Sequence, residues 1–97
     1  MTTSEHISVS RAGAVNIVRI DRPDKKNALT SGMYEAMTAA LTAGEADDDV
    51  AVHLLLGVPG AFSSGNDVAE FAAAAATGKL GLQVLDFLVA LASLDKP

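Results

Sequence analysis

Residues 50–56, VAVHLLL, form an apolar run that only His53 interrupts. A run this short and partly β-branched is typical of a central strand that other elements cover on both faces. The turn residues 57–60 (GVPG) end it, because proline cannot donate to a β-ladder. We therefore expect this strand to lie inside a sheet, with other elements packed on both sides.

Two further strands are predicted near the N-terminus. Residues 7–20 alternate around Ile7 and Val9, break near Gly13 and resume, which is typical of a β-hairpin. The second arm is apolar on both faces, so we expect it to be covered on both sides. Pro23 then ends the strand pattern.

Three helices are predicted from spacing and composition. Helical periodicity begins at an N-cap, Thr30 or Ser31, and fades after Gly44. Alanine-rich residues from Val68 onward favour a second helix, which Thr77-Gly78 ends. The segment 80–94 is apolar around much of its circumference and needs partners on several sides. A further strand is expected after Pro97, so the sequence is interpreted as a fragment of a larger protein.

Composition and charge narrow the classes of function. The 97 residues make one small domain at most, and no apolar run reaches the roughly 18–20 residues of a membrane span. Without such a run we expect no membrane partner. The net charge of −5 repels a phosphate backbone, so we expect no nucleic acid partner either. Cysteine is absent, so disulfides are absent and redox chemistry does not indicate a compartment. The first residues lack the pattern of a secretory signal, so we expect a cytoplasmic protein.

Basic residues concentrate in one segment of this acidic chain. Arg19, Arg22, Lys25 and Lys26 lie within eight residues of one another. Such a local basic loop suits a small anionic ligand better than a polymer. A solvated turn explains the same residues equally well, and both interpretations stay open.

Residues 60–71, GAFSSGNDVAEF, offer two serines beside an aspartate, which suggests a hydrolase. The spacing does not match the Gly-x-Ser-x-Gly elbow, and the candidate bases are His6, near the terminus, and His53, inside an apolar strand. Two distant histidines and scattered carboxylates make no metal site, so no metal is expected. A phosphate-binding P-loop also fails, because Leu80 follows Gly78-Lys79 and the earlier glycine is absent.

The backbone of the same stretch is the remaining candidate for chemistry. Gly65 can adopt a positive φ, and Asn66 or Asp67 can cap the helix that follows, whose N-terminus carries partial positive charge. Together these features make an oxyanion site of N–H donors. An ordinary capped turn also favours these residue types and remains the alternative.

Three motifs in order resemble the crotonase (enoyl-CoA hydratase/isomerase) superfamily. They are residues 22–29 (RPDKKNAL) after an IVRI strand, an LLLG strand, and residues 61–68 (AFSSGNDV), and 95–97 (DKP) resembles the lead-in to the family's next strand. The resemblance implies an α/β fold, a crotonase-like spiral of ββα units of which residues 1–97 are the N-terminal part. It also implies acyl-CoA thioester substrates, coenzyme A as part of the substrate rather than a separate cofactor, and trimers or hexamers.

The resemblance also assigns roles to individual residues. It places the Asn66 backbone N–H as the first oxyanion donor to the thioester oxygen, and it makes the serines scaffolding. The second donor and the acid/base glutamate would follow Pro97, and Glu70 is expected to be a surface or helix-capping charge. The coenzyme A contacts would come from Lys25, Lys26, Ala28 and Leu29, and the thioester pocket would be lined by Ser64, Gly65, Asn66, Asp67 and Val68.

Two functional hypotheses follow from the resemblance. The first is an acyl-CoA-processing enzyme, and the form FSSGND is closest to the Δ3,Δ2-enoyl-CoA isomerases of the superfamily. The alternative is a truncated or non-catalytic crotonase-like module that binds acyl-CoA or only assembles with partners, because no acid/base residue is identified in the chain.

Overall fold

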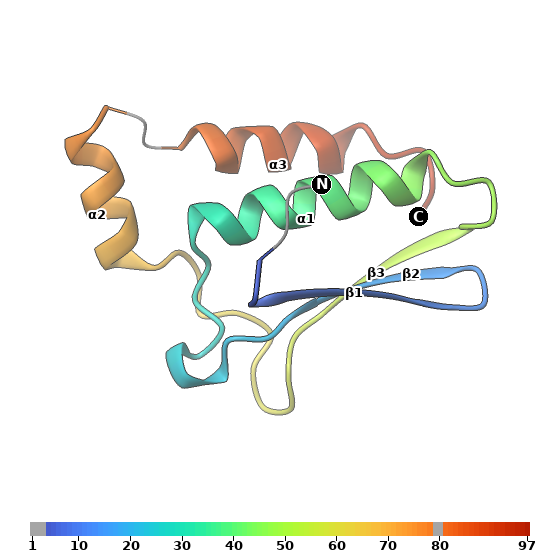
Figure 1. Ribbon diagram of the computed structural model, residues 1–97, viewed down its shortest axis with the longest axis horizontal. Helices are drawn as coiled ribbons and strands as arrows, with labels where there is room; N and C mark the ends of the chain where they lie inside the picture. Colours follow the sequence, from blue (N-terminus) through green and yellow to red (C-terminus); the bar gives the residue numbers. More distant parts are fainter. Residues whose placement is uncertain (1–3, 79–80) are drawn as a thin grey trace.

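The computed structural model describes residues 4–78 and 81–97. A three-stranded sheet carries one long helix on one face, and a second helix packs against the first (Figure 1). The predicted element order is confirmed, with a short 3-10 turn, η1, between the second strand and the first helix. The elements are β1 (Ile7–Ala12), β2 (Val15–Ile20), η1 (Pro23–Lys25), α1 (Ser31–Glu45), β3 (Val52–Leu56), α2 (Val68–Ala76) and α3 (Leu82–Ala92).

The predicted hairpin is confirmed, and it fixes the position of β2 in the sheet. β1 and β2 pair antiparallel from Ile7 opposite Ile20 to Ala12 opposite Val15, and Gly13 makes the turn with φ +56°. β2 pairs on its other edge with β3, in parallel. β2 is therefore the central strand of the three.

α1 covers one face of the sheet and supplies most of the core. Thr30 is its N-cap, accepting a hydrogen bond from the Met33 N–H (3.3 Å), as one of the two predicted caps. Met33, Met37 and Leu41 recur at helical spacing and are buried against Val18 and other residues of β2. Parallel strands need a crossover of this kind between them, so α1 follows directly from the β2–β3 pairing.

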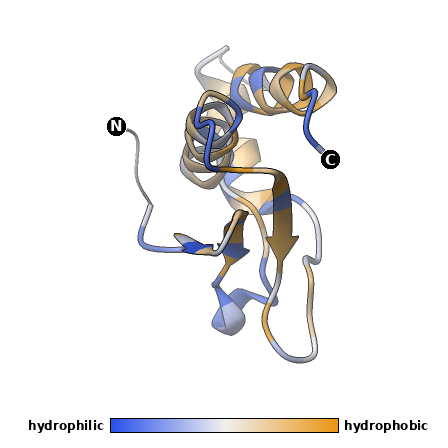
Figure 2. Cartoon of the chain, turned by 90° about the vertical axis from the view of Figure 1, so that its right-hand side faces the viewer, coloured by the Kyte–Doolittle hydropathy of each residue, from blue (hydrophilic) through white to orange (hydrophobic). Residues whose placement is uncertain are grey.

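The expectation that both faces of β2 and β3 are covered is wrong for the described chain. α1 lies on one face only, and no described helix lies on the other (Figure 2). β3 lies at the edge of the sheet, and its Leu54 is exposed. The apolar sequence of a strand indicates that the strand favours burial, but it does not identify the elements that cover it. The His53 N–H donates to the Pro97 carbonyl (2.8 Å), so residue 97 reaches β3.

His53 is a satisfied core residue, as its place in an apolar strand predicts. Its Nδ1 lies 3.1 Å from the Asn16 amide nitrogen, and its Nε2 lies 3.1 Å from a carboxylate oxygen of Glu45. Asn16 is fully buried and also donates to the Ala40 carbonyl (3.2 Å). Both ring nitrogens are therefore used in packing, which supports the argument against a catalytic base here.

α2 and α3 leave much of their apolar surface uncovered. α2 begins at the predicted Asp67 cap and ends at Thr77, as expected. α3 packs against α1 through Phe87 and neighbouring residues, but Leu85, Leu88 and Val89 are all more than half exposed. The expectation that this helix needs partners on several sides agrees with that exposure; the predicted helix start at Leu80 lies outside the described residues.

Candidate functional site

The basic loop and the glycine loop lie side by side, although some forty residues separate them in sequence. The Leu29 N–H donates to the Gly65 carbonyl (2.8 Å), and the Asp67 N–H donates to the Leu29 carbonyl (2.8 Å). The Ser64 N–H donates to the Lys26 carbonyl (3.1 Å). Leu29 therefore contributes to the site by pairing the two loops, with its side chain buried.

Asn27 joins the same two loops through its side chain, a role that the sequence reasoning missed. It is fully buried and has φ +57°. Its amide nitrogen lies within hydrogen-bond distance of the carbonyls of Ile20 (3.1 Å), Ala61 (3.2 Å) and Phe62 (3.0 Å). Its side-chain oxygen accepts from the Arg22 N–H (2.7 Å). An asparagine directly after two lysines, before a buried leucine, was the available signal, because asparagine tolerates a left-handed backbone.

The four clustered basic residues divide into two structural arginines and two exposed lysines. Arg19 donates to the Gly57 carbonyl (2.8 Å), and Arg22 forms a mostly buried ion pair with Asp67 (2.8 Å). Lys25 and Lys26 are exposed at the end of η1. Only the lysines therefore present charge to a ligand, so the candidate ligand-binding part of the basic segment is its second half.

Asp67 anchors the start of α2. One carboxylate oxygen accepts from the Glu70 N–H (3.0 Å), and the other accepts from Arg22. These bonds, first the Glu70 N–H and then Arg22, hold the pKa of Asp67 below its usual value. The carboxylate is therefore committed to holding the loop and the helix together.

The backbone at residues 65–66 directs one N–H away from the neighbouring loop. Gly65 has φ +99°, which residues with a side chain rarely adopt. In the parallel bridge between Leu29 and Asn66, the hydrogen bonds use the flanking Gly65 carbonyl and Asp67 N–H, so the N–H of Asn66 itself points away from Leu29. No acceptor for that N–H is found within residues 4–78 and 81–97.

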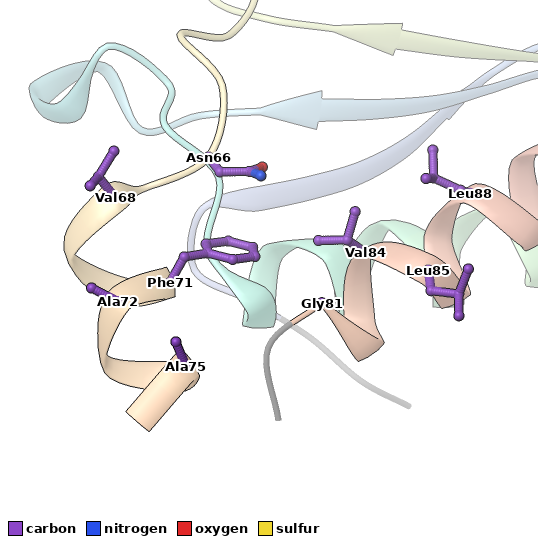
Figure 3. Close-up of a pocket in the computed structure, with 9 residues that line it drawn as sticks. All are labelled: Asn66, Val68, Phe71, Ala72, Ala75, Gly81, Val84, Leu85 and Leu88. Atoms are coloured by element: carbon purple, nitrogen blue, oxygen red, sulfur yellow. The ribbon is translucent and has the colours of Figure 1, made fainter. Parts of the chain in front are cut away.

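A groove of about 710 Å³ lies beside this loop, between α2 and α3 (Figure 3). Its wall is apolar apart from Asn66, whose side chain extends from the loop toward the space between the two helices. The Tyr34 hydroxyl, from α1, donates to the Asn66 side-chain oxygen (2.5 Å). The described lining residues are Asn66, Val68, Phe71, Ala72, Ala75, Gly81, Val84, Leu85 and Leu88.

The Ser63 hydroxyl and Glu70 hold the scaffold together, whereas Ser64 is exposed and joins the loops through its backbone N–H. The Ser63 hydroxyl donates to the Asn27 carbonyl (2.9 Å) and accepts from the Gly65 N–H (3.1 Å). Glu70 accepts from the N–H (3.3 Å) and the hydroxyl of Ser31, so it caps the first turn of α1 rather than its own helix. Its other carboxylate oxygen is buried without a partner among the described residues.

The described residues contain neither a cluster of metal ligands nor a membrane-spanning helix. No group of three or more His, Cys, Asp or Glu side chains in this part of the chain could hold a metal ion. None of the described helices is long and apolar enough to cross a membrane.

Comparison with known proteins identifies the family of this chain. Residues 10–97 match the family model described as enoyl-CoA hydratase/isomerase. The chain belongs to this family. Rat enoyl-CoA delta isomerase 2 is 31% identical over 99 residues, an alignment that covers 97% of this chain and 25% of that protein. The resemblance to the crotonase superfamily is thereby confirmed.

Similar solved structures confirm the fold. OdaA of Pseudomonas aeruginosa superposes with a TM-score of 0.87 at 41% identity, over 97% of this chain and 38% of that one. An enoyl-CoA hydratase/carnithine racemase from Magnetospirillum magneticum gives 0.88 at 28% identity, over 98% and 38%. The α/β arrangement of ββα units thus matches the N-terminal part of crotonase structures, and the chain spans well under half the length of these relatives.

Proposed function

We propose that the protein acts on acyl-CoA thioesters and stabilises a thioester enolate through a backbone oxyanion hole. This chain supplies the first oxyanion donor, the N–H of Asn66, and the loop that contacts coenzyme A. When a base removes a proton next to the thioester carbonyl, the electron pair moves onto the carbonyl oxygen. A preorganised N–H aimed at that oxygen lowers the barrier by about 3–4 kcal/mol.

The direction of the Asn66 N–H is the observation that carries the proposal. It points away from the paired loop at the mouth of an apolar groove, one residue before the N-cap of α2. The partial positive charge of that helix end adds to the donor. The groove beyond it suits an acyl chain, since its lining is apolar.

The basic loop supports the coenzyme A half of the proposal. Lys25 and Lys26 are exposed, with no carboxylate partner among the described residues, and are available to the phosphates of the nucleotide. Ala28 follows them closely in sequence, and its backbone is held in place: its N–H donates to the Lys25 carbonyl (3.0 Å), and its carbonyl accepts from Arg22 (3.2 Å). Because the Lys26 and Leu29 backbones pair with residues 64–67, a nucleotide held by the lysines would stay in register with a thioester at Asn66.

We propose that the remaining machinery belongs to the rest of a crotonase domain of which residues 1–97 are the N-terminal part. A second oxyanion donor and a catalytic carboxylate would follow Pro97, and the exposed apolar side of α3 would be covered in a trimer or hexamer. The FSSGND loop and the 31% identity to rat enoyl-CoA delta isomerase 2 favour isomerisation, in which one carboxylate moves a proton along the acyl chain.

A non-catalytic acyl-CoA-binding module is the second candidate. It is favoured by the use of both nearby carboxylates: Asp67 is held by Arg22 and the α2 N-terminus, and Glu70 accepts from Ser31. No carboxylate lines the described groove. Turnover of an enoyl-CoA by the 97-residue chain alone would exclude this candidate.

The test compares two glycine variants in calorimetric binding of butanoyl-CoA and free coenzyme A. A Cβ added at Gly65 or at Gly13 meets nothing within 4 Å, so each Ala variant mainly introduces strain at a positive φ, of about 1–3 kcal/mol. Gly13 lies at the hairpin turn, at the other end of the molecule (Figure 1). We expect G65A to weaken the binding of butanoyl-CoA without weakening the binding of free coenzyme A. We expect G13A to bind both ligands with wild-type affinity. If wild type binds neither ligand, the proposal is wrong.

Activity is read separately, by the ultraviolet absorbance of the conjugated thioester. Isomerisation of a 3-enoyl-CoA forms the conjugated 2-enoyl product and raises that absorbance, whereas hydration of a 2-enoyl-CoA removes it. Binding without either change would support the non-catalytic module.

A further inference from the structure

The side chain of Asn66 is held in place independently of its backbone. The Tyr34 hydroxyl donates a hydrogen bond to its Oδ1. The oxygen of the amide therefore faces the tyrosine. Because the amide group is planar, the Nδ2 group then points away from Tyr34, and both of its N–H donors remain available to a ligand.

Tyr34 is itself rigidly placed. Its ring packs edge-on against Phe71 of α2 (centroids 6.3 Å apart) and Phe87 of α3 (5.4 Å), and the residue is buried. Burial raises its pKa, so the hydroxyl keeps its proton and remains a donor at neutral pH. The orientation of the Asn66 amide is thus set by a residue that joins α1, α2 and α3.

The amide nitrogen of Asn66 meets an otherwise apolar groove. No other polar side chain is present among the described lining residues. An acyl chain that fills the groove removes water from Nδ2, and a polar group that loses water without gaining a partner costs about 1–3 kcal/mol. Binding of a purely alkyl chain leaves Nδ2 without a hydrogen bond. Binding of an acyl chain with an acceptor oxygen near the carbonyl gives Nδ2 a new partner and avoids this cost.

We infer that the Asn66 side chain, oriented by Tyr34, selects acyl-CoA thioesters whose acyl group carries a hydrogen-bond acceptor oxygen close to the thioester carbonyl. The inference rests on the proposed function, because the backbone N–H of the same residue is taken to hold the thioester oxygen. Both donors belong to one residue, which places the acceptor near the carbonyl rather than at the far end of the chain. Asn66 is then a specificity residue, and Tyr34 is a positioning residue.

The test uses pairs of saturated ligands that differ only by an oxygen in place of a methylene. Pentanoyl-CoA and 3-methoxypropanoyl-CoA place the difference near the carbonyl, while heptanoyl-CoA and 5-methoxypentanoyl-CoA place it farther along the apolar groove. For each pair, calorimetry gives the ratio of the alkyl to the ether dissociation constant. Comparing this ratio between variants cancels the hydration of the ether itself.

Two variants separate the donor from its support. N66A keeps the backbone N–H and removes the side-chain donor, and we expect it to lower the ratio for the shorter pair about fivefold, the value of one hydrogen bond. Y34F keeps the ring packing and removes only the hydroxyl, and we expect a smaller drop in the same ratio. Neither variant should change the ratio for the longer pair.

The outcomes are distinct for this inference and for the proposed function. Equal ratios for wild type and N66A in the shorter pair overturn the inference while acyl-CoA binding, and with it the proposed function, stands. An equal drop in both pairs also overturns it, because the effect would not depend on position. Failure of wild type to bind any of the four ligands overturns both.

Discussion

Removal of the Asn27 side chain should separate the two loops of the site. Its two amide hydrogens serve three carbonyls, those of Ile20, Ala61 and Phe62, and its oxygen accepts from the Arg22 N–H. N27A therefore loses about three hydrogen bonds, each worth about 0.5–1.5 kcal/mol, and it removes this partner from the part-buried Arg22 N–H and from the buried Ile20 carbonyl. Alanine at φ +57° adds about 1 kcal/mol of backbone strain.

We expect N27A to lower the free energy of unfolding by about 3–4 kcal/mol, a large part of what a small domain has. N27G loses the same bonds but not the backbone preference, so it should be about 1 kcal/mol less destabilised than N27A. N27D keeps the acceptor for the Arg22 N–H but places a negative charge against three carbonyls, so it should not restore the stability that N27A loses.

The assay combines urea unfolding with amide hydrogen exchange. Exchange should accelerate most at the Leu29 and Asp67 amides, which join the loops, and least in the interior of α1. An N27A protein within 0.5 kcal/mol of wild type, or one with unchanged exchange at these two amides, would refute the reasoning.

Three further outcomes are expected. K25A and K26A should each weaken butanoyl-CoA binding about two- to fivefold, and the effect should be smaller at high salt. Neither variant should weaken the binding of butanoyl-pantetheine, which lacks the nucleotide. Equal effects on both ligands would contradict the assignment of the lysines to the nucleotide phosphates. The lowered pKa of Asp67 means that its stabilising bonds are present above the unfolded value near 3.9 and are lost as the pH falls through the folded value. The Glu70 amide proton should therefore shift on acidification in wild type and not in D67N, and a flat wild-type titration would count against the cap. Because Leu88 is more than half exposed, L88E should reduce self-association measured by sedimentation, and unchanged association would show that this face is not used.

The sequence was most informative where a residue has a local task. The hairpin turn and the end of α2 are decided by neighbours within a few residues and were predicted. The caps Thr30 and Asp67 were each predicted as one of two adjacent residues. The pairing of the two loops was not predicted; the family resemblance only assigned both loops to the same acyl-CoA ligand. Nothing local in residues 22–29 specifies residues 61–68 as a partner.

Burial and long-range polar contacts were harder to predict. The apolar run of β3 predicted burial that this chain does not provide, since coverage depends on elements distant in sequence. Arg22 looked like a ligand-binding charge, yet its partner is Asp67, forty-five residues away. Tyr34 gave no signal of its role, and the position of Asn27 after two lysines indicated a left-handed backbone but not its three carbonyl partners, because a buried side chain reveals its partners only in the folded chain.

The donor role of the Asn66 N–H is tested most directly by replacing the peptide bond between Gly65 and Asn66 with an ester, which removes that N–H and keeps both side chains. The protein is prepared by chemical ligation, and the infrared stretching frequency of a 13C-labelled thioester carbonyl in butanoyl-CoA is measured free and bound. The account predicts that binding lowers the frequency in the native protein and that the ester analogue abolishes most of this shift. An equal shift in both proteins would contradict it.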